Sequence, residues 1–318
     1  MNWRHVYGPV PSRRLGRSLG VNPIPSKTCD FSCAYCQLGR TTARVVRRRR
    51  FFPPEEILDE LAQAARIHGA EADFVTFVGE GEPTLSRDLG LLLTETRKLT
   101  ATPIAVITNG SLLHRSDVRR ELGACDVVMP SLDAPDEDTF RRLNRPPPQV
   151  RLATLVDGLV RFREEFAGSL RVEVMLVKGC NDSEAKLVGL RRLLDRIRPD
   201  LVYLNLPIRP PAEPWVEPPD AEGLERAQTL LAPAVLTWTT EEGEFSTVGF
   251  DDPVEAVLMI ARRHPMRSEQ IAETLGRRGR RAPGPVLQAL VASGHLRALE
   301  YRGDTFYVSG AAPWRGDR

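Results

Sequence analysis

The chain has 318 residues, of which 42% are apolar and 27% are charged, and these proportions exclude a disordered or fibrous protein. Its net charge is +2, but residues 1–50 carry eleven Lys or Arg and one acid, which leaves −8 for the remainder. Such asymmetry is typical of proteins with a phosphate- or carboxylate-rich partner. Because no apolar run approaches the roughly 18 residues that span a bilayer and no secretory pattern begins the chain, we expect a cytoplasmic protein without membrane contact.

Short apolar runs alternate with helical segments along the first two thirds of the chain. Runs that are apolar on both faces are typical of parallel strands covered by helices. Six β/α units within about 210 residues predict an α/β fold, specifically a partial (β/α)6 barrel. The expected strands cover residues 18–24, 73–79, 103–108, 126–132, 170–178 and 201–206, and the expected helices cover residues 54–68, 86–99, 115–122, 151–166 and 183–197.

The pattern changes after a proline-rich connection at residues 207–219. One further helix and strand follow, and a different module begins near residue 250. Its three expected helices and final two-stranded hairpin resemble a winged helix-turn-helix domain. The expected organisation is a barrel over residues 1–240, a linker over residues 241–249 and the winged-helix-like module over residues 250–318.

Three of the five cysteines, Cys29, Cys33 and Cys36, fall within eight residues after the first expected strand. The odd total and the clustering argue against disulfides and indicate a metal or catalytic site. The C-x3-C-x2-C spacing can hold three irons of a cubane cluster and leave the fourth iron open. A zinc site is the alternative, but it needs a fourth ligand and no obvious one lies nearby. Cys125 and Cys180 are expected to be buried thiols.

This loop resembles the C-x3-C-x-aromatic-C loop of the radical S-adenosylmethionine (SAM) superfamily, with Tyr35 as the aromatic residue, and the likeness extends over residues 7–240. The resemblance implies that the three cysteines bind a [4Fe–4S] cluster and that Tyr35 lies beside the cofactors. It implies that the reduced cluster cleaves SAM to methionine and a 5′-deoxyadenosyl radical, which removes hydrogen from a substrate. The electron donor would then be a flavodoxin- or ferredoxin-like protein.

The second expected strand ends in Gly79, Glu80, Gly81 and Glu82, where the superfamily holds the methionine amine of SAM. Glu80 replaces the first glycine of the family motif, so Gly81 and Glu82 match it strictly. Carbonyls and a carboxylate suit an ammonium group, and glycine allows close approach of the backbone. The resemblance therefore implies SAM contacts at Gly79, Gly81 and Glu82, whereas the stretch read alone also fits a turn with solvated acids.

Polar residues also end the third and fourth expected strands, where parallel barrels gather their chemistry. We expect Asn109, Ser131 and Asp133 to bind the ribose hydroxyls and the methionine carboxylate of SAM. Helix capping or turn formation is the alternative reading of these residue types. No residue is assigned a catalytic role on the substrate.

Within the superfamily, the likeness is greatest to the iron–sulfur oxidoreductases grouped with wyosine-base (tRNA) synthases. It rests on residues 8–14, 18–23, 81–85 and 144–146. Wyosine synthases carry a second set of cysteines, which Cys125 and Cys180 cannot supply. A pyruvate-using wyosine reaction is therefore not expected.

Two basic segments suit the phosphates of an RNA substrate, although either could be a solvated face. Three functions are compatible with the sequence: an RNA-modifying enzyme that docks through the module, an enzyme acting on a peptide, protein or small molecule, and a redox-sensing DNA-binding regulator. A regulator would not need SAM-type strand ends. The basic residues are Arg40, Arg44 and 47–50 after the cysteine loop, and Arg277, Arg278, Arg280 and Arg281 in the module.

Overall fold

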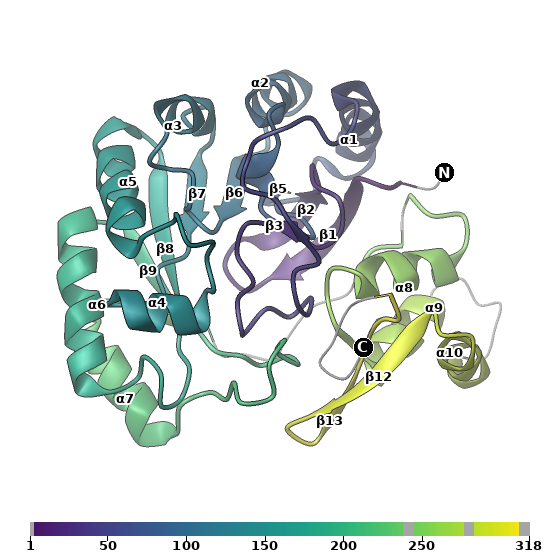
Figure 1. Cartoon of the computed structure of the whole chain (residues 1–318). Helices are drawn as coiled ribbons and strands as arrows, with labels where there is room; N and C mark the ends of the chain where they lie inside the picture. Colours follow the sequence, from purple (N-terminus) through teal and green to yellow (C-terminus); the bar gives the residue numbers. More distant parts are fainter. Residues whose placement is uncertain (1–2, 238–244, 248, 277–282, 312–318) are drawn as a thin grey trace.

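The computed structural model describes residues 3–237, 245–247, 249–276 and 283–311, and its larger part is a curved sheet with helices along the outer face (Figure 1). In this eight-stranded sheet the first strand is antiparallel to its neighbour, and all the other strands run parallel. The predicted α/β fold with a partial barrel is therefore confirmed. In sheet order the strands are β1 (Val6–Ser12), β2 (Gly16–Val21), β5 (Phe74–Phe77), β6 (Ile104–Thr108), β7 (Val127–Pro130), β8 (Ser169–Met175), β9 (Leu201–Asn205) and β10 (Val235–Thr237).

Amphipathic helices follow the strands because their apolar residues recur at helical spacing and face the sheet. In the first helix, for example, Ile57, Leu61 and Ala64 form the buried stripe. None of the helices in the described part of the chain is both long enough and apolar enough to cross a bilayer. The helices of this part are α1 (Pro54–His68), the short 3-10 helix η1 (Pro83–Leu85), α2 (Leu89–Leu99), α3 (Ser116–Leu122), α4 (Glu137–Leu143), α5 (Leu152–Glu165), α6 (Glu184–Ile197) and α7 (Ala221–Leu230).

The hairpin of β1 and β2 reaches the opposite edge of the sheet. Arg13, in its turn, donates a hydrogen bond of 2.6 Å to the carbonyl of Thr237 in β10. Leu15, from the same turn, is buried in a cluster that includes Phe74 and Val127, the first residues of β5 and β7. The hairpin thus links the two edge strands, and Leu15 fills the end of the barrel interior where the parallel strands begin.

A second unit follows the barrel and has its own apolar core, which includes Val257, Ile260 and Ile271. Its three strands form an antiparallel sheet in the order β11-β13-β12. The order of three helices and a hairpin follows the expectation from sequence, and β11 adds one strand. The elements are α8 (Pro253–Ala261), β11 (Met266–Arg267), α9 (Ser268–Gly276), α10 (Pro283–Ala292), β12 (Leu296–Tyr301) and β13 (Asp304–Ser309).

The C-terminal unit is hydrogen-bonded to the barrel at separate points. The Tyr301 hydroxyl donates to the carbonyl of Pro207 over 2.5 Å. Arg263, just after α8, donates to the carbonyl of Arg4 over 2.8 Å and accepts a bond of 3.2 Å from the Gln37 side chain. The second unit therefore rests against both the beginning of the chain and the cysteine loop.

Truncation of Leu15 is expected to destabilise the barrel. The residue is 2% exposed, so Leu15→Ala removes buried methyl groups and leaves a cavity, at a cost of about 2–5 kcal/mol. Thermal unfolding followed by circular dichroism should show a lower Tm. Leu91→Ala is the control, because Leu91 is 46% exposed and its loss should cost less than about 0.5 kcal/mol. Equal Tm values for the two variants would contradict the packing role of Leu15.

Candidate functional site

The three clustered cysteines lie on one loop that leaves the short strand β3 (Thr28–Cys29). This strand pairs with β4 (Ala43–Arg44), which returns from the loop. Within the loop, the N–H of Cys36 donates to the carbonyl of Cys33 over 3.1 Å and closes a turn. All three thiols are half-buried and unbridged, so they are chemically available as ligands.

Each of the three sulfur atoms has a nitrogen donor close to it. Donors of this kind stabilise thiolates and tune the potential of iron–sulfur clusters. The three thiols and their donors therefore fit a cluster that is held by three cysteines. The donor–sulfur pairs are Asn109 Nδ2 with Cys29 (3.7 Å), Asn144 Nδ2 with Cys33 (3.8 Å) and Lys27 Nζ with Cys36 (3.8 Å).

Burial raises the pKa of the Cys29 and Cys33 thiols, and the neighbouring Asp30 carboxylate raises that of Cys29 further. Both thiols are therefore protonated until a metal displaces the proton. Among the residues that the structure describes, no three His, Cys, Asp or Glu side chains converge on one point suited to a single metal ion. A cubane cluster takes one thiolate per iron, so its ligands do not have to converge in that way.

The end of β5 packs tightly against the cysteine loop. A Cβ atom added at Gly81 would lie 1.7 Å from the carbonyl oxygen of Thr28, so only glycine fits here. The N–H of Glu82 donates to the same carbonyl over 3.0 Å. At Gly79 an added Cβ would lie 2.2 Å from Oδ1 of Asn22. The strand end that we expect to hold SAM is thus fixed beside Cys29.

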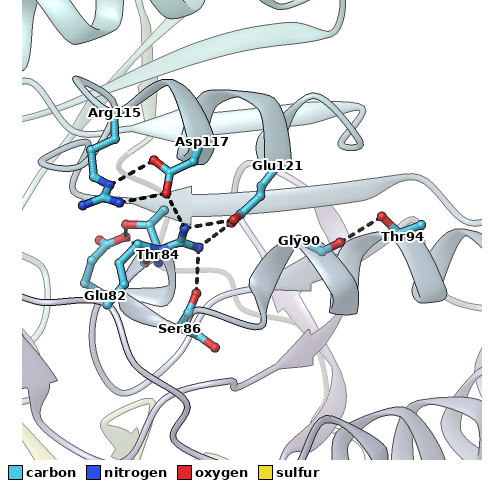
Figure 2. A network of polar contacts seen from close by, with 9 residues as sticks. Glu82, Thr84, Ser86, Gly90, Thr94, Arg115, Asp117 and Glu121 are labelled. Atoms are coloured by element: carbon cyan, nitrogen blue, oxygen red, sulfur yellow. Dashed lines mark hydrogen bonds and ion pairs between the residues drawn. The ribbon is translucent and has the colours of Figure 1, made fainter.

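Glu82 is a buried carboxylate that bonds to residues at the end of β6, and Figure 2 shows it beside Thr84. Its Oε1 accepts hydrogen bonds from the N–H and hydroxyl of Thr84 and from the hydroxyl of Thr108, at 2.6–2.9 Å. Its Oε2 accepts the N–H of Asn109 over 2.7 Å. Burial, reinforced by Asp30, raises the pKa of Glu82 to about 7. Glu82 therefore connects η1 and β6 to the end of β5. Because Oε2 accepts a single hydrogen bond, it is the oxygen that could still accept one from the SAM ammonium, a contact that remains a prediction.

Asp133 holds the cysteine loop from the other side. Its Oδ2 accepts hydrogen bonds from the Tyr35 hydroxyl (2.5 Å) and Asn144 Nδ2 (2.6 Å), and its Oδ1 accepts the N–H of Met175 (2.8 Å). Burial raises the pKa of Asp133, and burial together with Asp133 raises the pKa of Tyr35 well above its ordinary value. Tyr35 is thus a protonated donor fixed on Asp133. Contact of either residue with a cofactor remains a prediction.

The other two predicted SAM residues occupy neighbouring strand ends. Asn109 donates from Nδ2 to Asp30 over 2.6 Å, and its Oδ1 accepts the N–H of Ser111. Ser131 follows β7, is half-buried and donates its N–H to the carbonyl of Thr108 over 3.1 Å. The structure brings Asn109 to the cysteine loop and leaves Ser131 one strand away.

A cavity of about 330 Å³ is lined by residues of the barrel and by Arg263 and His264 of the C-terminal unit. Tyr35, Cys36 and Gly79 line it. A larger hollow of about 750 Å³ separates the cysteine loop from the C-terminal unit, with Lys27 and Met259 in its lining. Because the smaller cavity reaches both Cys36 and the end of β5, it is the better candidate for the reaction chamber.

Ion pairs neutralise much of the basic segment after the cysteine loop. Figure 2 shows Asp117 and Glu121, the two acids that pair with Arg48. Arg47 and Arg49 are exposed, as is Arg44, which donates to the carbonyl of Arg145 over 2.8 Å. The arginines at 277, 278, 280 and 281 lie outside the described residues. The ion pairs of the segment are Arg40–Glu213, Arg48–Asp117, Arg48–Glu121 and Arg50–Asp88.

Three residues close to the cysteine thiols were not predicted from the sequence as site residues: Lys27, Asp30 and Asn144. Lys27 is buried, and besides approaching Cys36 it donates to the carbonyl of Gly39. Two composition signals could have identified part of this set. Lys27 is one of four lysines in a chain that otherwise uses arginine, and Asp30 is the one acid among the first fifty residues.

Comparison with known proteins identifies the family of the chain. The model of the radical SAM superfamily matches residues 24–191. A UPF0026 protein of Methanocaldococcus jannaschii is 35% identical over 95% of both chains. A UPF0026 protein of Synechocystis sp. is 41% identical over 64% of this chain and 76% of its own length. The solved structure of TYW1 with a lysine–pyruvate adduct bound matches with a TM-score of 0.53 and 21% identity, over 69% of this chain and 74% of the TYW1 chain. At this identity the similarity concerns the fold alone.

The matched region covers more than half of the chain and includes the cysteine loop and the ends of β5, β6 and β7. The expected resemblance is therefore confirmed at the level of the family. The chain belongs to the radical SAM superfamily, and it is an enzyme that uses a [4Fe–4S] cluster and SAM.

Proposed function

We propose that Cys29, Cys33 and Cys36 hold the cluster and that SAM binds between it and the ends of β5, β6 and β7. The observation that carries this proposal is the nitrogen donor 3.7–3.8 Å from each of the three sulfurs. When bound, the cluster and SAM together supply the one-electron chemistry that removes a hydrogen atom from a substrate. The chain itself positions the substrate and excludes water.

The residues of this chain have separate tasks in the proposed site. The Lys27 ammonium offsets the charge of the Cys36 thiolate, which would otherwise be costly in a partly buried position. Gly79 and Gly81 let the backbone carbonyls of the strand end approach the SAM ammonium. The proposed SAM-binding residues are Gly79, Gly81, Glu82, Asn109, Ser131 and Asp133, with Tyr35 beside them.

We propose RNA as the substrate class. Arg44, Arg47 and Arg49 are exposed on the segment that leaves the cysteine loop, so a phosphate bound there would lie near the cluster. A flavodoxin- or ferredoxin-like protein would supply the electron. Residues 250–318 would form a winged-helix docking arm, joined to the barrel of residues 1–240 by the linker of residues 241–249.

A peptide or protein substrate is the second candidate, and the composition of α10 favours it. In helix-turn-helix domains, one helix usually reads the nucleic acid. The third helix of this unit, α10, contains no charged residue, and its Val291 is exposed. A neutral, partly apolar helix suits a protein partner better than a phosphate backbone.

Cluster binding is expected to depend on the three loop cysteines and on neither of the others. Cys33→Ala should reduce the iron content to near zero and abolish release of 5′-deoxyadenosine during anaerobic incubation with SAM and reductant. Cys125→Ala and Cys180→Ala are the controls, because both thiols lie buried outside the loop. Loss of the cluster in either control would show that the ligand assignment is wrong.

Glu82→Gln is expected to weaken SAM binding ten- to a hundredfold, because a charge-assisted hydrogen bond contributes about 1.5–3 kcal/mol. Iron content should stay unchanged, since the side chain does not ligate the cluster. Titration of SAM into the reconstituted variant measures the effect. Glu222→Gln, on an exposed position of α7, is the matched control. Wild-type affinity in Glu82→Gln would remove Glu82 from the site.

Binding to structured RNA is expected to weaken steeply as salt rises, because each neutralised phosphate releases counterions. Replacing Arg44, Arg47 and Arg49 by Ala should lower affinity and flatten the salt slope by up to about 2 units, as filter binding would measure. Ala at Arg191, Arg192 and Arg196, three exposed positions of α6, provides the control. Absence of RNA binding at low salt would favour the peptide or protein substrate.

A further inference from the structure

Glu80 is a buried acid at the strand end where we propose that SAM binds. It lies three residues after Phe77, the last residue of β5, and is 2% exposed. Its backbone carbonyl accepts the N–H of Lys27 over 2.7 Å, and its carboxylate receives a bond of 3.4 Å from the Asn22 side chain. The family motif has glycine here, which needs no compensating charge. A buried carboxylate, by contrast, is costly unless a positive charge lies against it.

The compensating charge comes from the C-terminal unit. Nη2 of Arg263 lies 3.3 Å from Oε1 of Glu80, and the Arg263 side chain is only 5% exposed. Nε of Arg262 is 3.8 Å from the other carboxylate oxygen, but that side chain is 46% exposed. Burial lowers the pKa of Arg263, and the Glu80 carboxylate opposes the shift. Arg263 is therefore the buried partner of Glu80.

Arg263 is also anchored to both units around it. Its guanidinium donates to the carbonyls of Arg4 (2.8 Å) and Met259 (3.2 Å) and lies 4.7 Å above the ring of Tyr7. Its own carbonyl accepts a bond of 3.2 Å from Gln37, the residue after Cys36. One residue of the C-terminal unit thus contacts the end of β5 through its side chain and the cysteine loop through its backbone.

The strand end has little room to shift if this pair is broken. The next residue, Gly81, already approaches the Thr28 carbonyl so closely that a Cβ atom would lie 1.7 Å from it. Glu82 follows, with its hydrogen bonds to β6 and η1. A displacement of Glu80 toward solvent would therefore change the positions of the backbone carbonyls on both sides of Gly81.

We propose that Arg263 is a positioning residue for SAM: by pairing with Glu80 it fixes the end of β5, so that docking of the C-terminal unit is required for tight SAM binding. The inference rests on the proposed binding of SAM at this strand end. Because coupling between two binding equilibria is reciprocal, SAM must in turn stabilise the docked C-terminal unit.

Arg263→Met tests the proposal in the full-length reconstituted enzyme. We expect SAM affinity to fall tenfold or more, with unchanged iron content, because Glu80 keeps its charge and loses its partner. In the double variant Glu80→Gln with Arg263→Met, the buried charge is gone, and SAM affinity should return to within about threefold of the wild type. If Arg263 only stabilises the fold, adding Glu80→Gln is not expected to restore SAM affinity.

Arg119→Met is the matched control. Arg119 in α3 is similarly buried, and its side chain bonds to Glu165, Leu113 and His114, none of which is a proposed SAM-binding residue. The Arg119→Met variant should have a lower Tm and an unchanged SAM affinity. If Arg263→Met binds SAM as tightly as the wild type, the inference is overturned but the proposed function stands. If the wild-type enzyme itself does not bind SAM, the proposed function is overturned.

Hydrogen exchange on the wild-type enzyme gives a second test that needs no variant. Addition of SAM should slow exchange in peptides that cover α8 and Arg263 as well as in peptides of the barrel. Protection confined to the barrel would contradict the reciprocal coupling. If Arg263→Met does not yield folded protein, the double variant and the hydrogen-exchange experiment test the inference instead. A double variant that folds but binds SAM more than tenfold more weakly than the wild type overturns the inference.

Discussion

Buried carboxylates at the strand ends hold the cysteine loop in one position. Glu80, Glu82 and Asp133 are all buried, and a carboxylate is stable in such a place only when donors or a positive charge surround it. Each of them therefore fixes its partners: Arg263 for Glu80, the residues around β6 for Glu82, and Tyr35 for Asp133. The loop would otherwise be a surface segment of little regular structure, with its thiols poorly placed for a shared cluster.

The surroundings of the sulfur atoms follow from the same constraint. Asn144 approaches Cys33 with the amide nitrogen that also donates to Asp133. Asn109 approaches Cys29 in the same way, with its amide nitrogen bonded to Asp30. In both cases a buried carboxylate orients an amide, and the amide is directed at a sulfur. Such indirect support is what positions ligands accurately in metal sites.

Local patterns predicted the parts of the molecule that depend on local sequence. The strand and helix periodicities and the spacing of Cys29, Cys33 and Cys36 were sufficient for the α/β fold and the family. Strand β1 was not predicted because its two prolines obscure the strand pattern, and helix α4 was also missed although α3, of the same length, was predicted. It also missed the pair Glu80–Arg263, because contacts between residues so far apart leave no local signal. Sequence alone also does not reveal that acids from distant segments pair with several arginines of residues 1–50.

If Cys29, Cys33 and Cys36 hold the cluster as we propose, three of its irons would be thiolate-ligated and the fourth would be open to SAM. Mössbauer spectroscopy of the iron-57-reconstituted enzyme, with and without SAM, distinguishes irons that differ in their ligands. We expect a [4Fe–4S] spectrum in which SAM alters the signal of one iron in four, while the other three keep their thiolate-ligated parameters. A spectrum that does not respond to saturating SAM, or one in which all four irons are equivalent and thiolate-ligated, would contradict this proposal.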